Sequence, residues 1–234
     1  MERFTIVTGA SRGIGLEIAK KFLSEGFTVI NISRNISPLP NIVNISCDLS
    51  NDWELDELSK KISKVISSLG EMHLIHNASA VIEDSVTSVN ELDLIQMLKL
   101  NVVSPAKLNK ILVPFMCKNS SITYVGSTLS EKSVRDTFSY TTVKHAVVGM
   151  MKATAQDLFG EGIHTTCVCP GFTKTDMLEG QLLSKKIATQ DLEKLVSFGR
   201  LISPAEIAKV VFFCSRNPVF NGSVIHANLG QLEL

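Results

Sequence analysis

The chain has 234 residues, of which 44% are hydrophobic, and its 23 Lys and Arg residues balance 23 Asp and Glu residues. The length and apolar content fit one large domain, and the balanced charge gives no sign of a nucleic-acid or anionic-membrane partner. No apolar run approaches the ~20 residues that span a bilayer, no signal region is present, and the five cysteines form no C-x-x-C pair. We therefore expect a cytoplasmic protein with reduced thiols and no metal site.

Short β-branched runs alternate with amphipathic stretches along the chain. Strands are predicted at 4–8, 28–32, 42–47, 72–76, 121–126, 163–169 and 223–227. Helices are predicted at 14–23, 51–69, about 87–117, 138–159 and from about 204, with a less regular region up to about 200. The alternation predicts a single α/β domain over 1–234, a doubly wound parallel sheet with helices on both faces. Ligands of such sheets bind beyond the carboxyl ends of the strands.

A glycine-rich turn, TGASRGIG (8–15), follows the first strand. Gly9, Gly13 and Gly15 allow a tight turn that approaches a pyrophosphate, and the helix that follows directs free N–H groups at such an anion. The alternative is an ordinary glycine-rich strand-to-helix turn. The spacing G-x-x-x-G-x-G after Thr8 resembles the short-chain dehydrogenase/reductase family, which implies a Rossmann-type fold and a bound nicotinamide cofactor.

The resemblance covers essentially the whole chain and implies a set of cofactor contacts after successive strands. These are Gly9, Ser11, Arg12, Gly13, Ile14, Gly15, Ser33, Arg34, Asp48, Leu49, Asn77, Ala78, Tyr140, Lys144, Pro170, Gly171 and Thr173. Asp48 matches a family contact to the adenine ring, with a capping role near the next helix as the alternative.

The second strand ends in NISRN (31–35), without the acidic residue that would bind the ribose 2′-hydroxyl of NAD. Arg34 would instead hold a 2′-phosphate bidentately, with Arg12 as a second cation. The alternative is that both arginines are solvated loop residues. We expect NADP(H) to be preferred over NAD(H).

The resemblance places the catalytic groups at Asn101, Ser127, Tyr140 and Lys144. Ser127 precedes Tyr140 by thirteen residues, the family's usual separation, and Lys144 follows four residues later on the same helix face. Each residue also has a structural alternative. Ser127 could cap a turn, Asn101 could hydrogen-bond to the backbone of a bent helix, and Tyr140 and Lys144 could be surface residues without a function.

The chemistry accounts for these residue types. Carbonyl reduction needs a hydride from the nicotinamide and a proton at oxygen. A free phenol has a pKa of about 10, and a neighbouring ammonium and an oxidised cofactor lower it, so Tyr140 is expected to act as general acid/base beside Lys144. Ser127 would donate to the developing alkoxide, and Asn101 would bind a water that links Lys144 to solvent.

The chain also departs from the family. HNAS (76–79) replaces the usual N-N-A-G, and Ser79 adds a side chain beside the adenosine ribose. We expect His76 to be a hydrogen-bonded structural residue rather than an acid or base.

A substrate lid is expected at about 175–200. Its apolar wall would consist of Met177, Leu178, Leu182, Leu183, Leu192, Leu195, Val196 and Phe198. A helix pair packed on the core is the alternative. The substrate is expected to be a small carbonyl or alcohol compound of unidentified class.

Two other functions remain open at this point. A non-catalytic NADP(H)-binding sensor would typically lack the Tyr or Lys. A methyltransferase on a similar sheet would not explain Ser127, Tyr140 and Lys144. Proteins of the family that this chain resembles are commonly dimers or tetramers, and the apolar positions of the 138–159 helix are compatible with a subunit interface, so we expect a homodimer or homotetramer.

Overall fold

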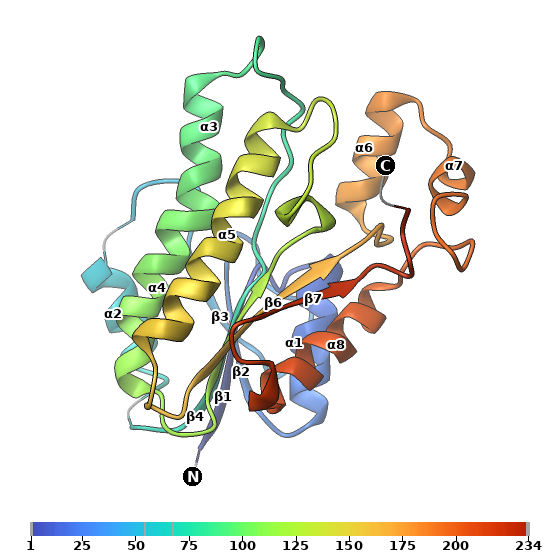
Figure 1. Ribbon diagram of the computed structural model, residues 1–234. Helices are drawn as coiled ribbons and strands as arrows, with labels where there is room; N and C mark the ends of the chain where they lie inside the picture. The colour runs from blue at the N-terminus through green and yellow to red at the C-terminus, as the bar shows by residue number, and fades with distance from the viewer. Residues whose placement is uncertain (1, 54, 67, 233–234) are drawn as a thin grey trace.

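The computed structural model describes residues 2–53, 55–66 and 68–232 (Figure 1). Its strands are β1 (Arg3–Thr8), β2 (Thr28–Ser33), β3 (Val43–Ser46), β4 (Glu71–His76), β5 (Ser121–Val125), β6 (His164–Pro170) and β7 (Ser223–Ala227). They form one parallel sheet in the order β3-β2-β1-β4-β5-β6-β7. The predicted strands are confirmed to within one residue at each end.

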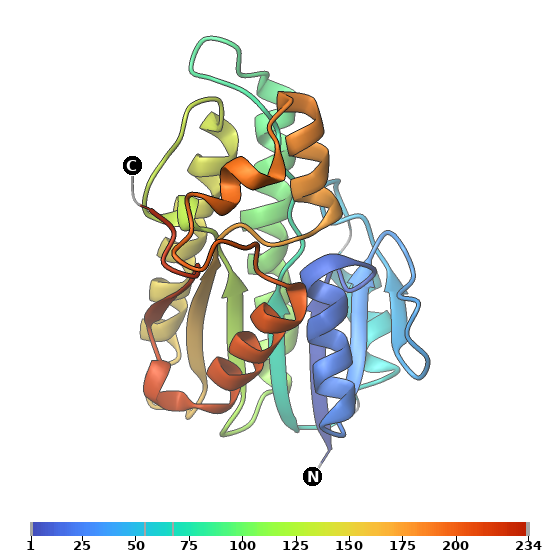
Figure 2. The ribbon, with the colours of Figure 1, turned by 90° about the vertical axis from the view of Figure 1, so that its right-hand side faces the viewer.

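Helices cover both faces of the sheet, as Figures 1 and 2 show. They are α1 (Gly13–Ser24), α2 (Leu55–Ser63), α3 (Glu91–Leu98), α4 (Ser104–Leu112), α5 (Phe138–Asp157), α6 (Asp176–Lys185), α7 (Thr189–Glu193) and α8 (Pro204–Arg216). One core cluster joins the sheet to α2, α4 and α5, and the other joins it to α1 and α8. The predicted single-domain, doubly wound fold is confirmed.

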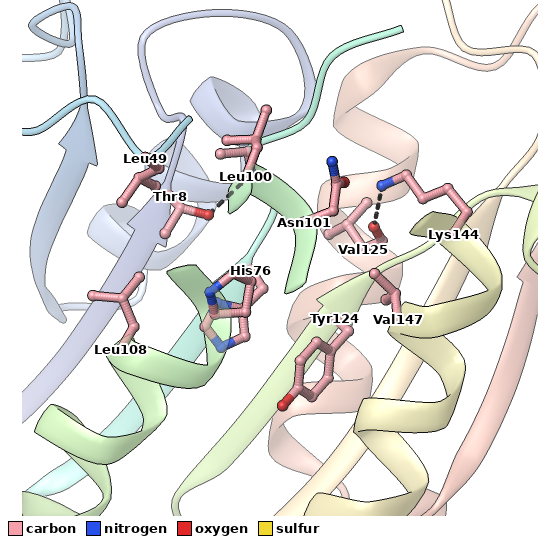
Figure 3. A pocket seen from close by; sticks show the side chains of 12 residues that line it. Thr8, Leu49, His76, Leu100, Asn101, Leu108, Tyr124, Val125, Lys144 and Val147 are labelled. Carbon is pink, nitrogen blue, oxygen red and sulfur yellow. Dashed lines mark hydrogen bonds between the residues drawn. The ribbon is translucent and has the colours of Figure 1, made fainter. Parts of the chain in front are cut away.

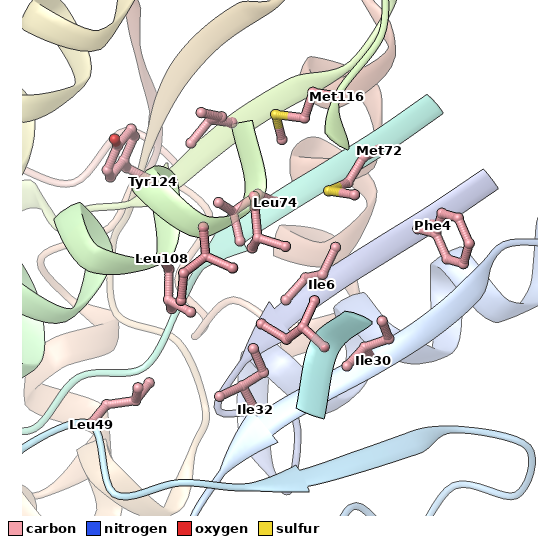
Figure 4. Packing of buried hydrophobic residues seen from close by; sticks show 14 of the residues in the cluster. Phe4, Ile6, Ile30, Ile32, Leu49, Met72, Leu74, Leu108, Met116 and Tyr124 are labelled. Atoms are coloured by element: carbon pink, nitrogen blue, oxygen red, sulfur yellow. The ribbon is translucent and has the colours of Figure 1, made fainter. Parts of the chain in front are cut away.

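Buried apolar side chains fill the space between the sheet and α4. Ile6, Ile30 and Leu74 come from three neighbouring strands and are fully buried on the same face, where Leu108 of α4 packs (Figure 4). Because successive strand residues alternate between faces, Val7 and Ile75 point to the opposite face, where they belong to the cluster that packs on α1 and α8. The strands are therefore apolar on both sides, as expected for a parallel sheet.

The helix predicted at 51–69 is shorter than expected. Trp53, which was predicted to be helical, is instead held against α4, where its Nε1 donates to Ser104 Oγ at 2.8 Å and Lys107 Nζ donates to its carbonyl at 2.8 Å. After α2, Ile66 is buried from a turn in which its N–H bonds to the Ile62 carbonyl. The apolar spacing reflects burial against one core as far as Ile66, beyond the end of the helix, whereas Leu69 is 62% exposed.

The long helical region predicted at 87–117 is interrupted. Asn90 caps α3 by accepting from the N–H groups of Leu92 and Asp93, and a π-helical segment, Lys99–Val103, separates α3 from α4. Pro105 stands in the first turn of α4 and lacks the N–H that a continuous α-helix would need there. Asn101 lies in this π-helical segment, and its side chain is buried in the protein interior.

The carboxyl ends of the strands lie at the upper end of Figure 1, where α6 and α7 stand above β6. The strand order reverses between β1 and β4, so the connections leaving these two strands diverge. A crevice is expected at that point. Among the described residues, no helix is long and apolar enough to cross a membrane.

Candidate active site

A large cleft opens at the carboxyl ends of the strands. It is lined by Gly9, Ser11, Arg12, Gly13, Ile14, Gly15, Ser33, Arg34, Asp48, Leu49, Asn77, Ala78, Ser127, Tyr140, Lys144, Pro170, Gly171 and Thr173, among others. The structure thus brings together every residue assigned to the cofactor and three of the four assigned to catalysis. Asn101 lies beneath, in a small inner cavity that Lys144 also lines.

The glycine turn is shaped for close approach of backbone atoms. Gly9 and Gly13 have φ of +74° and +58°, a region that L side chains rarely adopt. A Cβ at Gly15 would lie 2.2 Å from the Gly9 carbonyl oxygen and 2.5 Å from Asn77 Nδ2. The N-terminus of α1 has no side-chain cap, so its N–H groups remain available to an anion. A pyrophosphate fits this cradle.

Thr8 links the end of β1 to the segment that follows β4, at the point where the strand order reverses. Its Oγ1 accepts from the backbone N–H groups of Asn77 and Ala78, each at 2.9 Å. Asn77 Nδ2 donates in return to the Thr8 carbonyl at 2.9 Å. These bonds hold the segment after β4 against the glycine turn and fix the floor of the cleft.

Arg34 lies exposed at the rim of the cleft, near Asp48. Partial burial works to raise the pKa of Asp48, but hydrogen bonds from Ser50 and Asn51 and the charge of Arg34 together lower it. Asp48 Oδ1 accepts from the Ser50 N–H at 3.0 Å, so this side chain caps a turn after β3 and not α2. Arg12 lies 3.5 Å from Asp176 of α6, a contact between exposed groups.

Tyr140 and Lys144 both face the cleft from α5. Lys144 is 3% exposed, its Nζ donates to the Val125 carbonyl at 3.0 Å, and it lies 5.6 Å from the centre of the Tyr140 ring. Burial lowers the pKa of Lys144 to about 8. In the ligand-free protein, burial raises the pKa of Tyr140, although a hydrogen bond with Ser127 works against this.

The direction of the Tyr140 shift in the free protein is opposite to the expected lowering of its pKa. Desolvation is the largest cause of the raised pKa, and the Lys144 ammonium, 5.6 Å from the ring centre, donates to the Val125 carbonyl. A raised pKa keeps the phenol protonated near neutral pH. That is the protonation state a proton donor requires.

Ser127 also has the structural role that was its alternative. Its Oγ accepts from the Leu129 N–H at 3.1 Å, and Ser130 Oγ accepts from the Ser127 N–H, which forms a capping box over the short helical turn Thr128–Ser130. A hydroxyl that accepts one bond still has its proton to donate. The cap therefore orients Ser127 without using the donor.

Asn101 lines the inner cavity with Lys144, Thr8 and His76 (Figure 3). Its Nδ2 donates to the Met97 carbonyl at 3.0 Å, so it does satisfy the backbone of a distorted helix. Its Oδ1 accepts from Ser79 Oγ at 2.8 Å. Asn101 is therefore held beneath the cleft and does not project into it.

His76 is a structural residue in this arrangement, as expected. Its Nε2 lies 2.8 Å from Asn109 Oδ1, and its ring packs beside Tyr124. Burial lowers the pKa of His76 to about 4, which leaves the ring neutral near pH 7. A neutral, buried ring is poorly suited to supply charge to the cleft.

Asp84 was not identified from the sequence. This buried carboxylate lies in the segment after β4 and reaches the N-terminus of α5, where its oxygens accept from the N–H and the hydroxyl of Ser139. Its carbonyl also accepts from the Phe138 N–H. No local pattern marks it, because its partner is 55 residues away.

The predicted lid region contains α6 and α7, and part of it lines the cleft. Met177, Leu178, Leu182 and Leu192 belong to the lining. Leu183 and Phe198, predicted for the same wall, are 80% and 70% exposed and do not line the cleft. Leu195 and Val196 instead pair with the C-terminal segment at Leu232 and Gln231. Residues four apart on a helix share a face, so Leu178 and Leu182 of α6 both face the cleft, whereas Leu183 faces away from it.

Further apolar residues of the lining come from loops that the sequence pattern did not single out. They are Val81 and Ile82 after β4 and Val134 before α5. Among the described residues, no group of three potential ligands is placed to hold a metal ion, and Cys167 and Cys169 are buried thiols with their Sγ atoms 3.8 Å apart.

Comparisons with known proteins agree with this geometry. A family model described as short chain dehydrogenase matches residues 3–186. The chain is 27% identical to carbonyl reductase family member 4 of Xenopus laevis over the full length of both chains. It is 28% identical to a 3-oxoacyl-[acyl-carrier-protein] reductase of Thermotoga maritima, covering 89% of this chain and 88% of the other. A short chain dehydrogenase family protein from Francisella tularensis superposes with a TM-score of 0.88 at 28% identity, covering 98% of each chain.

Proposed function

Because the chain belongs to the short-chain dehydrogenase/reductase family and is an oxidoreductase acting on C=O or CH–OH groups, we propose that it prefers NADP(H) over NAD(H) and reduces a carbonyl to an alcohol, or the reverse. The observation that carries the proposal is the convergence of Tyr140, Lys144 and Ser127 on a cleft that the glycine turn, Gly9 to Gly15, also lines. The cofactor, when bound, supplies or accepts the hydride.

Each side chain has a distinct part in the proposed reaction. Tyr140 is protonated in the free protein and gives its proton to the substrate oxygen as the carbon is reduced. Ser127, held by its cap, donates a hydrogen bond to the same oxygen. Lys144 stabilises the phenolate that remains. In alcohol oxidation the same groups act in reverse.

The apolar side of the cleft indicates where the substrate lies. Val81, Ile82, Val134, Leu178 and Leu182 line the same cleft and are not among the predicted cofactor contacts. We propose that α6 and α7 form a lid over this part and that the substrate presents an apolar body to it.

A carbonyl panel tests the proposal directly. The wild-type protein is expected to oxidise NADPH in the presence of apolar ketones or aldehydes, and absorbance of NADPH measures the rate. Tight NADPH binding without turnover on any carbonyl would instead favour the alternative function, a non-catalytic NADP(H)-binding protein.

Arg34→Gln tests the cofactor preference. Removing a charged hydrogen bond to a 2′-phosphate is expected to raise the Kd of NADPH about 10- to 100-fold. The Kd of NADH should stay within about twofold, because NADH has no such phosphate. Lys152→Gln, which removes the same charge from an exposed position of α5 outside the cleft, is the control. An equal loss of both cofactors would contradict the role given to Arg34.

The pH dependence of the reaction tests Lys144. Its pKa of about 8 in the free protein means that the ammonium is lost as the pH rises through about 8. The kcat/KM for NADPH in carbonyl reduction is therefore expected to be level below about pH 8 and to fall about tenfold per pH unit above it. Tyr140, with its pKa raised, stays protonated through this change. Lys144→Arg, whose charge persists, should lose this alkaline limb whatever its absolute rate. A wild-type profile that stays level well above about pH 9 would contradict the assignment.

A further inference from the structure

Ser79 makes a contact that its sequence position does not predict. Its Oγ donates to Asn101 Oδ1 at 2.8 Å, while Asn101 Nδ2 donates to the Met97 carbonyl at 3.0 Å. Only one of the two orientations of the amide satisfies both partners, because the flipped amide would set its oxygen against a carbonyl. The Met97 carbonyl therefore selects the orientation of the amide, and Ser79 adds a second hydrogen bond that restrains a side chain that is 3% exposed.

The hydroxyl of Ser79 has one proton and two lone pairs. The Ala80 carbonyl is 3.4 Å from Oγ, a longer contact than the bond to Asn101, so the proton is committed to Asn101. The lone pairs remain available as acceptors. A hydroxyl bound in this way holds a neighbour in place and does not itself pass a proton onward.

The location of Ser79 gives this acceptor a use. Ser79 lines the cleft together with Tyr140 and Lys144, whereas Asn101 lines the inner cavity beneath. With its Oδ1 already occupied, Asn101 has less acceptor capacity for a water that would link Lys144 to solvent. The Ser79 oxygen can accept a hydrogen bond from that water in place of Asn101, and Ser79, unlike Asn101, lines the cleft itself.

We propose that Ser79 is a positioning residue for proton supply, which restrains the Asn101 amide with a second hydrogen bond and presents its own oxygen as the acceptor for the water that returns a proton to Lys144. The inference rests on the proposed function. The proton lost from Tyr140 in each reduction is replaced by one from solvent, with no change of oxidation state in the protein. A glycine at this position would leave the amide restrained by its bond to the Met97 carbonyl alone.

The first measurement needs no cofactor. The side-chain amide signal of Asn101 is assigned by its absence in Asn101→Asp, and its proton exchange with water is measured by NMR. In Ser79→Ala the amide is expected to exchange about tenfold faster, since a bond worth about 1.4 kcal/mol no longer restrains it. Ser79→Thr keeps the hydroxyl and should exchange within about twofold of wild type. Ser88→Ala, an exposed serine of the same loop outside the cleft, is the matched control.

The second measurement uses carbonyl reduction. Ser79→Ala is expected to lower kcat about tenfold and to raise the solvent deuterium isotope effect, with the KM for NADPH within about twofold, because proton supply and not binding is impaired. Ser79→Thr should recover most of the loss. A wild-type kcat or a wild-type exchange rate in Ser79→Ala overturns the inference. If the wild-type protein reduces no carbonyl, the proposed function fails and the inference with it, and the exchange measurement then shows whether the contact itself exists.

Discussion

Tyr140→Phe is expected to abolish carbonyl-dependent NADPH oxidation, lowering kcat by about 10²- to 10⁴-fold, the usual contribution of a positioned acid. The change removes one oxygen and keeps the ring on α5. The phenol is the group that remains protonated in the free protein and that hydrogen-bonds with Ser127. The Kd of NADPH should stay within about twofold, because the change removes only the phenolic oxygen and leaves the glycine turn, where the pyrophosphate is proposed to bind, unaltered. Steady-state rates and fluorescence titration of NADPH measure the two quantities.

The chain offers a matched control in its second tyrosine. Tyr124 is fully buried on β5, and its hydroxyl bonds to Asn109 and Thr154 and does not line the large cleft. Tyr124→Phe is expected to lower the free energy of unfolding by about 1 kcal/mol and to leave kcat unchanged. If both variants lose turnover alike, or Tyr140→Phe keeps it, Tyr140 is not the proton donor.

Gly15→Ala is expected to abolish NADPH binding, raising the Kd by at least about 100-fold. The added methyl group would lie 2.2 Å from the Gly9 carbonyl oxygen and 2.5 Å from Asn77 Nδ2, so the backbone of the turn must move. That movement displaces the N–H groups at the start of α1 that are proposed to hold the pyrophosphate. Because Asn77 also bonds to Thr8, the thermal midpoint should fall as well.

Gly149→Ala is the control for this change. Gly149 is an exposed residue of α5 with nothing within 4 Å of an added Cβ. Alanine there should stabilise the protein by about 0.5–1 kcal/mol, the difference in helix propensity, and leave NADPH affinity as it is. An unaltered Kd in Gly15→Ala would show that the turn is not the phosphate cradle.

The sheet could be predicted from the sequence because the strand signal is local. A strand buried on both faces is a short apolar run, and each of the runs ended near a glycine, proline or polar cluster that marks its carboxyl end. Since ligands bind at those ends, the predicted cofactor residues could be grouped before any contact was visible. They line one cleft for this reason.

What the sequence could not supply depends on partners far along the chain. The break at Lys99–Val103 follows from Pro105, but the inward placement of Asn101 depends on Met97 and Ser79 together. Apolar spacing in the lid region identified Leu178 and Leu182 correctly and wrongly included Leu183 and Phe198, because spacing does not show which face meets the cleft.

The cap that Asp84 provides links the helix bearing Tyr140, which follows β5, to the segment that follows the neighbouring strand β4. The first turn of α5 has no side-chain cap of its own, and its Ser139 N–H and Phe138 N–H are satisfied only when the segment after β4 is docked. Neither part can be lost without exposing unsatisfied groups of the other. The two therefore fray and re-form as one cooperative unit. We therefore expect Tyr140 and the part of the cleft formed by the segment after β4 to become ordered together during folding.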